Sequence, residues 1–315
     1  MSPAPHPAHS KRIVLAGGAG LVGQNLVDRL LAQGQPELVV LDKDPARLRA
    51  LRQRHPTVTT VTADLAESGP WADHLEGADA AVLLQAQISS PRETDFVRNN
   101  LVSTDRLLTA LRQYRVPYTL LISSSVVCSV AEDPYARSKR TQEQRFLASG
   151  LPGAVLRPTL LFGPHDRHHL GWLVRFMKRS PLFPLPGRGR HLRQPLYVRD
   201  FCGVIAHCLH TRPQDTCTNI TGLEPIDYVD LIRTLRRVSR ARCLLLPLPV
   251  PLFGALLRLY GVITRQPPFT ADQLNALVAG DRFEVNDWPA RFAVQPTPLA
   301  EAFEQTFGNA QQHHD

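Results

Sequence analysis

The sequence of 315 residues has no uninterrupted apolar run long enough to cross a membrane. Its longest apolar stretch, residues 243–263, is broken by three prolines and by Arg258. We therefore expect a helix over residues 252–263 that is buried or caps a pocket. The alternative is a helix that lies on a membrane surface, so that peripheral membrane contact stays open.

Cysteines are few, and the five present have no CxxC or other spacing typical of a metal site. Their odd number argues against a complete set of disulfides and favours a reducing compartment. Residues 1–10 are polar and lack the apolar core of a signal peptide, so we expect a disordered tail and a cytoplasmic location. Three histidines share a polar loop with Asp166, but no further carboxylate or cysteine is spaced to complete a site, and no metal is expected.

Acidic residues are outnumbered, 28 against 36 Lys and Arg, which gives a net charge of +8. The arginines cluster within residues 188–199 and 233–242. Such clusters favour an anionic partner, either a phosphorylated ligand or a membrane surface, and a merely solvated basic face is the alternative. Nucleic acid is not expected, because the clusters lack interleaved aromatic residues.

Short apolar runs alternate with segments of helical spacing in the first half of the chain. Strands are predicted at residues 12–15, 37–41, 58–62, 80–84, 118–123 and 154–156, with helices between them that include 46–54 and 100–112. This alternation is typical of an α/β fold with a Rossmann-type, doubly wound parallel sheet. We place that domain at residues 11–162 and a smaller, mixed C-terminal lobe at 163–310, with residues 194–220 returning to the Rossmann core.

A glycine-rich turn follows the first predicted strand and reads Gly17-Gly-Ala-Gly-Leu-Val-Gly23. Glycines at this spacing allow a tight turn, close approach of the backbone to a pyrophosphate, and close packing of helix on strand. The helix that opens here directs free N–H groups at the anion. The candidate phosphate-binding residues are Gly17, Gly20, Leu21, Val22 and Gly23.

Asp42 stands at the end of the second predicted strand, where an acidic residue accepts hydrogen bonds from the adenosine ribose. Its charge would repel a 2′-phosphate, which favours NAD over NADP, although the neighbouring Lys43 weakens that preference. The alternative is that Asp42 is only a turn residue ahead of Pro45.

These and further motifs resemble the extended short-chain dehydrogenase/reductase family of NAD-dependent epimerases and dehydratases. The motifs occur in the family's order and are Gly17–Gly23, Asp42, Asp64-Leu65, residues 100–104, 123–125 and 135–139, Arg157-Pro158, and residues 162–164 and 193–200. The resemblance implies an NAD-binding domain followed by a substrate lobe. It adds a set of cofactor contacts, which are Asp64, Leu65, Gln85, Gln87, Asn100, Tyr135, Lys139 and Pro158.

Tyr135 and Lys139 are four residues apart, so that they share one face of a helix and can act at one site. A nearby ammonium favours the phenolate, which would take or return the hydroxyl proton during hydride transfer. The resemblance implies that Lys139 also holds the nicotinamide ribose. It makes Ser124 the hydrogen-bonding partner of the reacting oxygen, with Ser125 as the second choice and a substrate contact.

The family pattern is altered around the predicted active site. Cys128 stands where the family usually has tyrosine, and the segment from Ser124 to Tyr135 is shorter than in epimerases. This shortening is similar to a divergent branch related to the NADH dehydrogenase accessory subunit. The C-terminal residues 267–273 also look like the tail of that branch.

Three functions follow from these observations. The first is oxidation or epimerisation of a sugar hydroxyl, on a nucleotide-linked sugar whose phosphates Arg193 would contact. The second is a hydroxysteroid or other lipid-alcohol dehydrogenase with the same catalytic residues. The third is a non-catalytic nucleotide-binding accessory protein. The resemblance also implies a possible homodimer.

Overall fold

A computed structural model describes residues 11–34, 36–129, 132–263, 274, 277–278, 280 and 282–308. The tail predicted at residues 1–10 and the motif at 267–273 lie outside the described residues.

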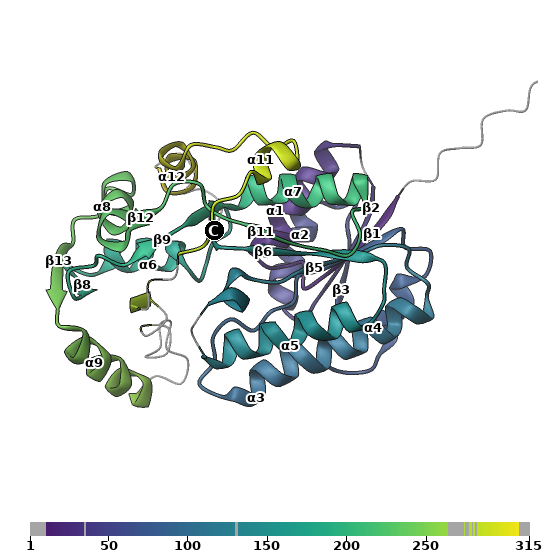
Figure 1. Ribbon diagram of the computed structural model, residues 1–315, viewed down its shortest axis with the longest axis horizontal. Coiled ribbons are helices and arrows are strands. Elements are labelled where there is room, and N and C mark those ends of the chain that lie inside the picture. Colours follow the sequence, from purple (N-terminus) through teal and green to yellow (C-terminus); the bar gives the residue numbers. More distant parts are fainter. Residues whose placement is uncertain are drawn as a thin grey trace, which may run out of the picture.

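Seven parallel strands form one twisted sheet in the order β11-β6-β5-β4-β1-β2-β3 (Figure 1). Their bounds are β1 Arg12–Ala16, β2 Glu37–Asp42, β3 Thr59–Thr62, β4 Ala80–Leu83, β5 Thr119–Ile122, β6 Gly153–Pro158 and β11 Thr216–Ile220. The order reverses direction between β1 and β4, which is the point where doubly wound sheets bind their ligands. The predicted α/β fold with a Rossmann-type sheet is confirmed.

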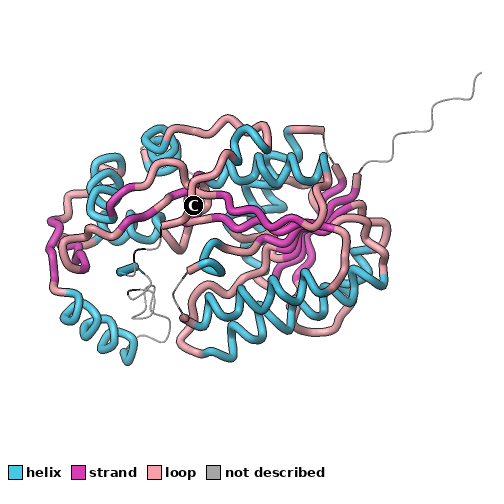
Figure 2. The backbone as a smooth tube through the Cα atoms, in the orientation of Figure 1, coloured by secondary structure: helices cyan, strands magenta, loops and turns pink. Residues whose placement is uncertain are grey.

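Helices cover both faces of this sheet (Figure 2). One face packs on α1 (Leu21–Ala32), α2 (Pro45–Arg54) and α7 (Val198–Thr211), and the other on η1 (Pro70–Leu75), α4 (Ser103–Gln113) and α5 (Pro134–Ala148). Alternate residues of a strand point to opposite faces, and both faces are buried here. The inner strands are therefore nearly continuous apolar runs, which is why the sequence predicts them well, whereas the edge strands β3 and β11 are rich in threonine and β11 was not predicted as a strand.

The helix predicted at residues 100–112 is longer than expected. It begins with α3 (Glu93–Phe96), passes through a π-helical segment η2 (Val97–Val102) and continues as α4. Periodicity of 3.6 residues does not reveal such a segment, because each wider turn shifts the buried face. The wider turn carries Asn100, which is fully buried.

The C-terminal lobe has its own core, formed largely by phenylalanine and leucine side chains. Its helices are α6 (Leu170–Arg179), α8 (Tyr228–Val238), α9 (Val250–Ile263) and α12 (Leu299–Phe307). Three two-stranded sheets join them: β7 (Leu160–Phe162) with β10 (Pro195–Tyr197), β9 (Leu192–Arg193) with β12 (Ile226–Asp227), and β8 (Leu182–Pro186) with β13 (Leu244–Leu248). A short helix, α11 (Trp288–Arg291), packs back on the main sheet core.

The helix expected at residues 252–263 is present as α9, but it is not buried as expected. Among its side chains described up to Leu259, Phe253 is the one that is buried, whereas Leu252, Leu256 and Leu259 are exposed. The sequence pattern could not separate these cases, because apolar residues occur all around this helix. In the part of the chain that the structure describes, no helix is both long and apolar enough to span a bilayer.

Candidate active site

The glycine turn connects β1 to α1 and is built too tightly for side chains. Gly17 has a φ of +77°, and a Cβ on it would lie 2.6 Å from the backbone of Gln85. A Cβ on Gly23 would lie 2.1 Å from the carbonyl oxygen of Gly18, so the first turn of α1 presses directly on the turn. At Gly20 the nearest atom would be 3.6 Å away, which leaves that position open.

The start of α1 fits an anion. No side chain caps the N–H groups of the first turn, which begins at Leu21 and Val22. Unpaired N–H groups and the positive end of the helix dipole attract phosphate. The open side of Gly20 therefore forms a cradle that an added methyl group would fill, as a site for the NAD pyrophosphate requires.

Asp42 ends β2 directly beside this turn. Its Oδ2 accepts a hydrogen bond of 3.0 Å from the N–H of Ala19, and its Oδ1 accepts one of 3.0 Å from the N–H of Asp44. The cap of α2 is Asp44, not Asp42. Asp42 therefore has the turn role that was given above as the alternative to ribose binding. It also places a carboxylate against the glycine turn, where a ribose would lie.

Asp64 follows β3 at the same edge of the sheet. It accepts hydrogen bonds from the N–H of Ala66 at 3.0 Å and from Nη1 of Arg98 at 2.7 Å. Burial raises the pKa of the Asp64 carboxyl, but the hydrogen bonds and the charge of Arg98 outweigh it, so the pKa lies below the usual value. Asp64 is therefore ionised at neutral pH, and the adjacent Leu65 is buried.

The loop after β4 is fixed by buried amides. Oδ1 of Asn100 accepts a hydrogen bond of 2.6 Å from the N–H of Gln87, and its Nδ2 donates to the Gln87 carbonyl and to Oγ of Ser138. Gln85 packs under Gly17 and donates from Nε2 to Oγ1 of Thr104 at 3.2 Å. Asn100 therefore positions the loop against α5. The sequence predicted a cofactor contact for Asn100 and did not predict this structural role.

The three predicted catalytic residues come together at the end of β5. Asp133 caps α5, accepting a hydrogen bond of 2.9 Å from the N–H of Ala136, and thereby fixes the turn that carries Tyr135. Ser124 lies near enough to Tyr135 for its hydroxyl to lower the pKa of the phenol. Lys139 lies one turn further along α5 and donates from Nζ to the Ile122 carbonyl at 2.9 Å. Ser125 is buried.

Burial shifts both titrating groups away from their charged forms. It raises the pKa of Tyr135 to about 12; the hydroxyl of Ser124 acts in the opposite direction, and the charge of Asp133 adds to the rise. Burial also lowers the pKa of Lys139 to about 7, against the attraction of Glu143. A lysine with this pKa can exchange a proton near neutral pH, as acid–base catalysis requires.

Two residues that are hydrogen-bonded in series with Lys139 were missed from the sequence. Nζ of Lys139 also donates to Oε1 of Gln142, and Nε2 of Gln142 donates to Oγ1 of Thr104 at 2.8 Å. Thr104 in turn accepts from Gln85, so buried hydrogen bonds connect Lys139 to the glycine turn. The available signal was the i, i+3 spacing of Lys139 and Gln142, which places both on one helix face.

Pro158 ends β6, next to an ion pair between Arg157 and Glu143. The guanidinium donates from Nε to both Glu143 oxygens, at 3.0 and 3.1 Å. Nη1 of Arg157 also lies 3.8 Å from Sγ of Cys128, the residue that departs from the family pattern. The pair holds β6 against α5 behind Lys139.

The polar histidine loop is occupied by contacts to α2. Nε2 of His165 lies 3.3 Å from Nη1 of Arg54, and Nε2 of His168 lies 2.9 Å from Nη2 of Arg47. Burial and the charge of Arg54 lower the pKa of His165 to about 4. Asp166 accepts hydrogen bonds from three backbone N–H groups that lead into α6. Among the described residues, no group of three or more His, Cys, Asp or Glu could hold a metal ion.

Arg193 lies in the C-terminal lobe rather than in the catalytic cluster. It ends β9, which pairs antiparallel with β12. Its charge lowers the pKa of the phenol of Tyr228, the half-buried first residue of α8, but burial of the phenol has the larger effect and raises that pKa well above the usual value. The structure thus groups Ser124, Tyr135 and Lys139 at the sheet edge, whereas Arg193 lies on the neighbouring lobe.

Comparison with known proteins agrees with this arrangement. The family model for the NAD dependent epimerase/dehydratase family matches residues 13–220, which is more than half of the chain. A ceramide reductase from Caulobacter vibrioides is 24% identical over 314 residues, covering 94% of this chain and 90% of that protein. A dTDP-glucose 4,6-dehydratase from Streptomyces niveus is 28% identical over 238 residues, covering 62% and 67%.

Another relative is much longer than this chain. The non-ribosomal peptide synthetase CmlP from Streptomyces venezuelae is 30% identical over 206 residues, which are 56% of this chain and 21% of that protein. The matched residues of this chain therefore correspond to about a fifth of that protein.

Solved structures show the same fold. The UDP-glucose 4-epimerase of Thermotoga maritima, solved with UDP-glucose, superposes with a TM-score of 0.74 at 17% identity and covers 94% of this chain and 97% of its own. The Bordetella bronchiseptica enzyme WbmF, in complex with NADH, superposes with a TM-score of 0.76 at 18% identity, covering 95% and 91%. The expected NAD cofactor and enzyme class are confirmed at the level of the family. The chain belongs to the NAD-dependent epimerase/dehydratase family of the extended short-chain dehydrogenases/reductases.

Proposed function

We propose that this protein catalyses reversible, NAD-dependent hydride transfer at a hydroxyl or keto carbon of a nucleotide-linked sugar. The observation that carries the reaction is that Ser124 lies near Tyr135, with Lys139 one helical turn away on α5. All three lie at the carboxyl edge of β5, the edge at which β1 meets the glycine turn. A substrate hydroxyl held there lies between a proton acceptor and the cofactor cradle.

In the oxidative direction, Tyr135 as phenolate takes the proton of the substrate hydroxyl while the hydride leaves the same carbon. NAD, when bound, supplies the acceptor for that hydride. Ser124 holds the reacting oxygen and, through its hydroxyl, stabilises the phenolate. The products are the ketone, the reduced cofactor and neutral Tyr135, and the reverse reaction returns the proton from Tyr135.

Lys139 makes this phenolate accessible. The half-buried phenol alone ionises only near pH 12, and a neighbouring ammonium lowers that cost. With a pKa of about 7, Lys139 shares its proton between charged and neutral forms at neutral pH. The Ile122 carbonyl and Gln142 hold the ammonium in place.

Basic groups in the C-terminal lobe support a phosphorylated substrate. Arg193 lies seven residues before Asp200, the place where nucleotide-sugar enzymes of this family contact substrate phosphates. Arg190 and His191 belong to the same segment. An arginine fork matches the geometry of a pyrophosphate.

A second substrate class is favoured by the apolar surface of the same lobe. Leu244, Leu252 and Leu256 are exposed on β13 and α9, which is unusual for a lobe that holds only polar ligands. The relative that covers 94% of the chain is named a ceramide reductase. These observations support reduction of a lipid ketone, or oxidation of a lipid alcohol, by the same three residues.

The test is a turnover assay with purified protein and NAD or NADH, against UDP- and dTDP-linked sugars and against long-chain ketones and alcohols. We expect a change in NADH absorbance with one class only. Turnover of nucleotide sugars supports the first proposal, and turnover of lipid ketones replaces it with the second. Tight NAD binding without turnover of either class would contradict both and leave the accessory function.

A further inference from the structure

The positive charge of this protein is concentrated in the C-terminal lobe. Residues 170–193 and 228–263 hold twelve of the 36 Lys and Arg residues, but one of the 28 acidic residues, Asp230. The remainder of the chain is slightly acidic, so these two segments account for the whole net charge of +8. A field of one sign over one end of a molecule favours a large anionic partner.

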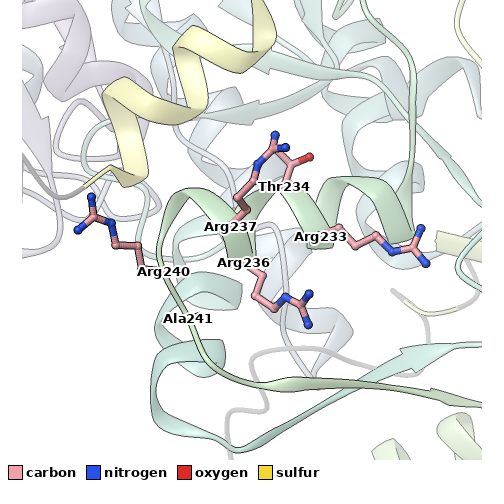
Figure 3. Close-up of a pocket in the computed structure, with 6 residues that line it drawn as sticks. All are labelled: Arg233, Thr234, Arg236, Arg237, Arg240 and Ala241. Carbon is pink, nitrogen blue, oxygen red and sulfur yellow. The ribbon is translucent and has the colours of Figure 1, made fainter.

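Six of these twelve basic residues lie on α8 and in the residues that follow it. Arg233, Thr234, Arg236, Arg237, Arg240 and Ala241 line an open cavity of about 530 Å³. Figure 3 shows the four arginine side chains extending from this stretch of chain. Arg233 is paired with Asp230 at 2.8 Å, and Arg236 donates to the Cys243 carbonyl at 3.2 Å. Arg237 and the nearby Arg242 are exposed.

Exposed leucines continue directly from this basic stretch. In the parallel pair of β8 and β13, Leu244 stands opposite Leu182, and Leu246 follows two residues later on the same face. All three are exposed, with Leu244 at 68%. The opposite face of this pair, which includes Phe183 and Leu185, packs in the core of the lobe.

Helix α9 extends the apolar surface. Leu252, Leu256 and Leu259 recur at i, i+4 and i+7 and form one exposed stripe, while Phe253 packs inward against Leu274 and Leu277. In Figure 1, β8, β13, α8 and α9 lie together at the end of the molecule farthest from the seven-stranded sheet. A helix with an apolar outer stripe beside clustered arginines is typical of proteins that lie on membrane surfaces.

We propose that this docking face, comprising the arginines of 233–242 and the leucines of β8, β13 and α9, binds the protein to a lipid bilayer with anionic headgroups. The arginines contact the headgroup phosphates, and the leucines enter the boundary between headgroups and acyl chains. A nucleic acid would satisfy the arginines but leave the leucines in water, so the bilayer fits the whole face better. The proposal does not depend on the reaction catalysed.

The test is co-sedimentation of the full chain with phosphatidylcholine vesicles and with vesicles that also contain phosphatidylglycerol. We expect binding to the anionic vesicles that falls as salt rises, and little binding to phosphatidylcholine alone. The double variant Arg237→Glu/Arg242→Glu should bind more than about tenfold more weakly, since each basic residue near an anionic surface contributes about 1 kcal/mol. The control Arg49→Glu/Arg52→Glu changes the net charge equally on exposed α2 positions and should bind as the wild type does.

The apolar part of the face is tested separately. Leu256→Ser should weaken vesicle binding, whereas Leu147→Ser, at a residue of α5 with the same 48% exposure, should not. Both variants should keep the wild-type melting temperature, because the side chains replaced are exposed. Equal binding to neutral and anionic vesicles, equal loss in the matched controls, or binding to duplex DNA or RNA without binding to vesicles would overturn the proposal.

Discussion

Tyr135 and Lys139 depend on each other because each is costly to ionise alone. Burial raises the pKa of the phenol to about 12 and lowers the pKa of the ammonium to about 7. Near neutral pH the isolated phenol would be neutral, and the isolated lysine would be divided between its charged and neutral forms. In the proposed reaction, an ammonium one helical turn away would lower the cost of removing the proton from Tyr135, since opposite charges stabilise each other.

Replacing Tyr135 by phenylalanine removes the proton acceptor and little else. We expect Tyr135→Phe to lower kcat by about 10²–10⁴-fold, the usual contribution of general acid–base catalysis, while the affinity for NAD changes little. Steady-state kinetics and calorimetric titration with NAD measure the two effects. Tyr114→Phe is the matched control, because its hydroxyl contacts Asp73 on the surface. Wild-type turnover in Tyr135→Phe would contradict the assigned role.

Lys139 makes folding stability depend on pH. Its pKa is about 7 in the folded protein and 10.5 in the unfolded chain, so between these values the unfolded state binds more protons. Stability should therefore rise with pH from 7 to about 10, by up to about 1.4 kcal/mol per unit from this residue. Above pH 10 the raised pKa of Tyr135 acts in the opposite direction.

Urea unfolding at pH 7, 8, 9 and 10 measures this contribution. The free energy of unfolding of the wild type should increase relative to that of Lys139→Met as the pH rises, because methionine has no proton to lose. Lys43→Met, at an exposed lysine, should show the pH profile of the wild type. A constant difference between wild type and Lys139→Met across this range would show that Lys139 keeps an ordinary pKa.

At the scale of elements, the sequence predicts best what depends on neighbouring residues. The glycine turn, the buried strands and the Tyr135–Lys139 spacing all follow from local patterns. The pairing of β8 with β13 joins segments about 60 residues apart, and no local pattern specifies it. The buried hydrogen bonds of Gln142 and Thr104 were missed for the same reason, because their partners come from different elements.

The glycine turn separates two effects that a substitution can have. Gly23→Ala places a methyl group 2.1 Å from the Gly18 carbonyl and must push α1 away from the turn, so it should destabilise the protein by several kcal/mol. Gly20→Ala meets nothing closer than 3.6 Å and should leave the stability of the NAD-free protein within about 1 kcal/mol of the wild type. Its methyl group nevertheless occupies the cradle, so the Kd for NAD should rise at least about tenfold.

Thermal unfolding without NAD and calorimetric titration with NAD distinguish these outcomes. Gly34→Ala is a further comparison, because it also has open space around it but lies at the other end of α1. Its φ of +145° means that a modest loss of stability is expected, without a change in NAD affinity. If Gly20→Ala bound NAD like the wild type, the pyrophosphate would not lie on this turn.

On the scale of the whole molecule, the sheet and the C-terminal lobe are joined through the last described segment. Side-chain amide atoms of Gln194 pair with both backbone groups of Phe283, at 2.8 and 2.9 Å. Asp200, at the start of α7, accepts two hydrogen bonds of 2.8 Å from Thr297. The chain thus leaves the lobe, crosses back over α7 and returns to the lobe in α12, so that the two parts share structure along their boundary.

Trp288 is the centre of this connection. It is 1% exposed, packs in the core of the main sheet and donates from Nε1 to the Thr221 carbonyl at 2.9 Å.

Trp288→Ala should lower the free energy of unfolding by about 3–5 kcal/mol, from lost burial and a cavity between α7 and the sheet. Trp172→Ala, at a partly exposed residue of α6, should cost clearly less. Urea unfolding followed by circular dichroism and by the remaining tryptophan fluorescence measures both variants. Because the segment belongs to both parts, the two probes should report one transition in the wild type, and two separate transitions would contradict the shared structure.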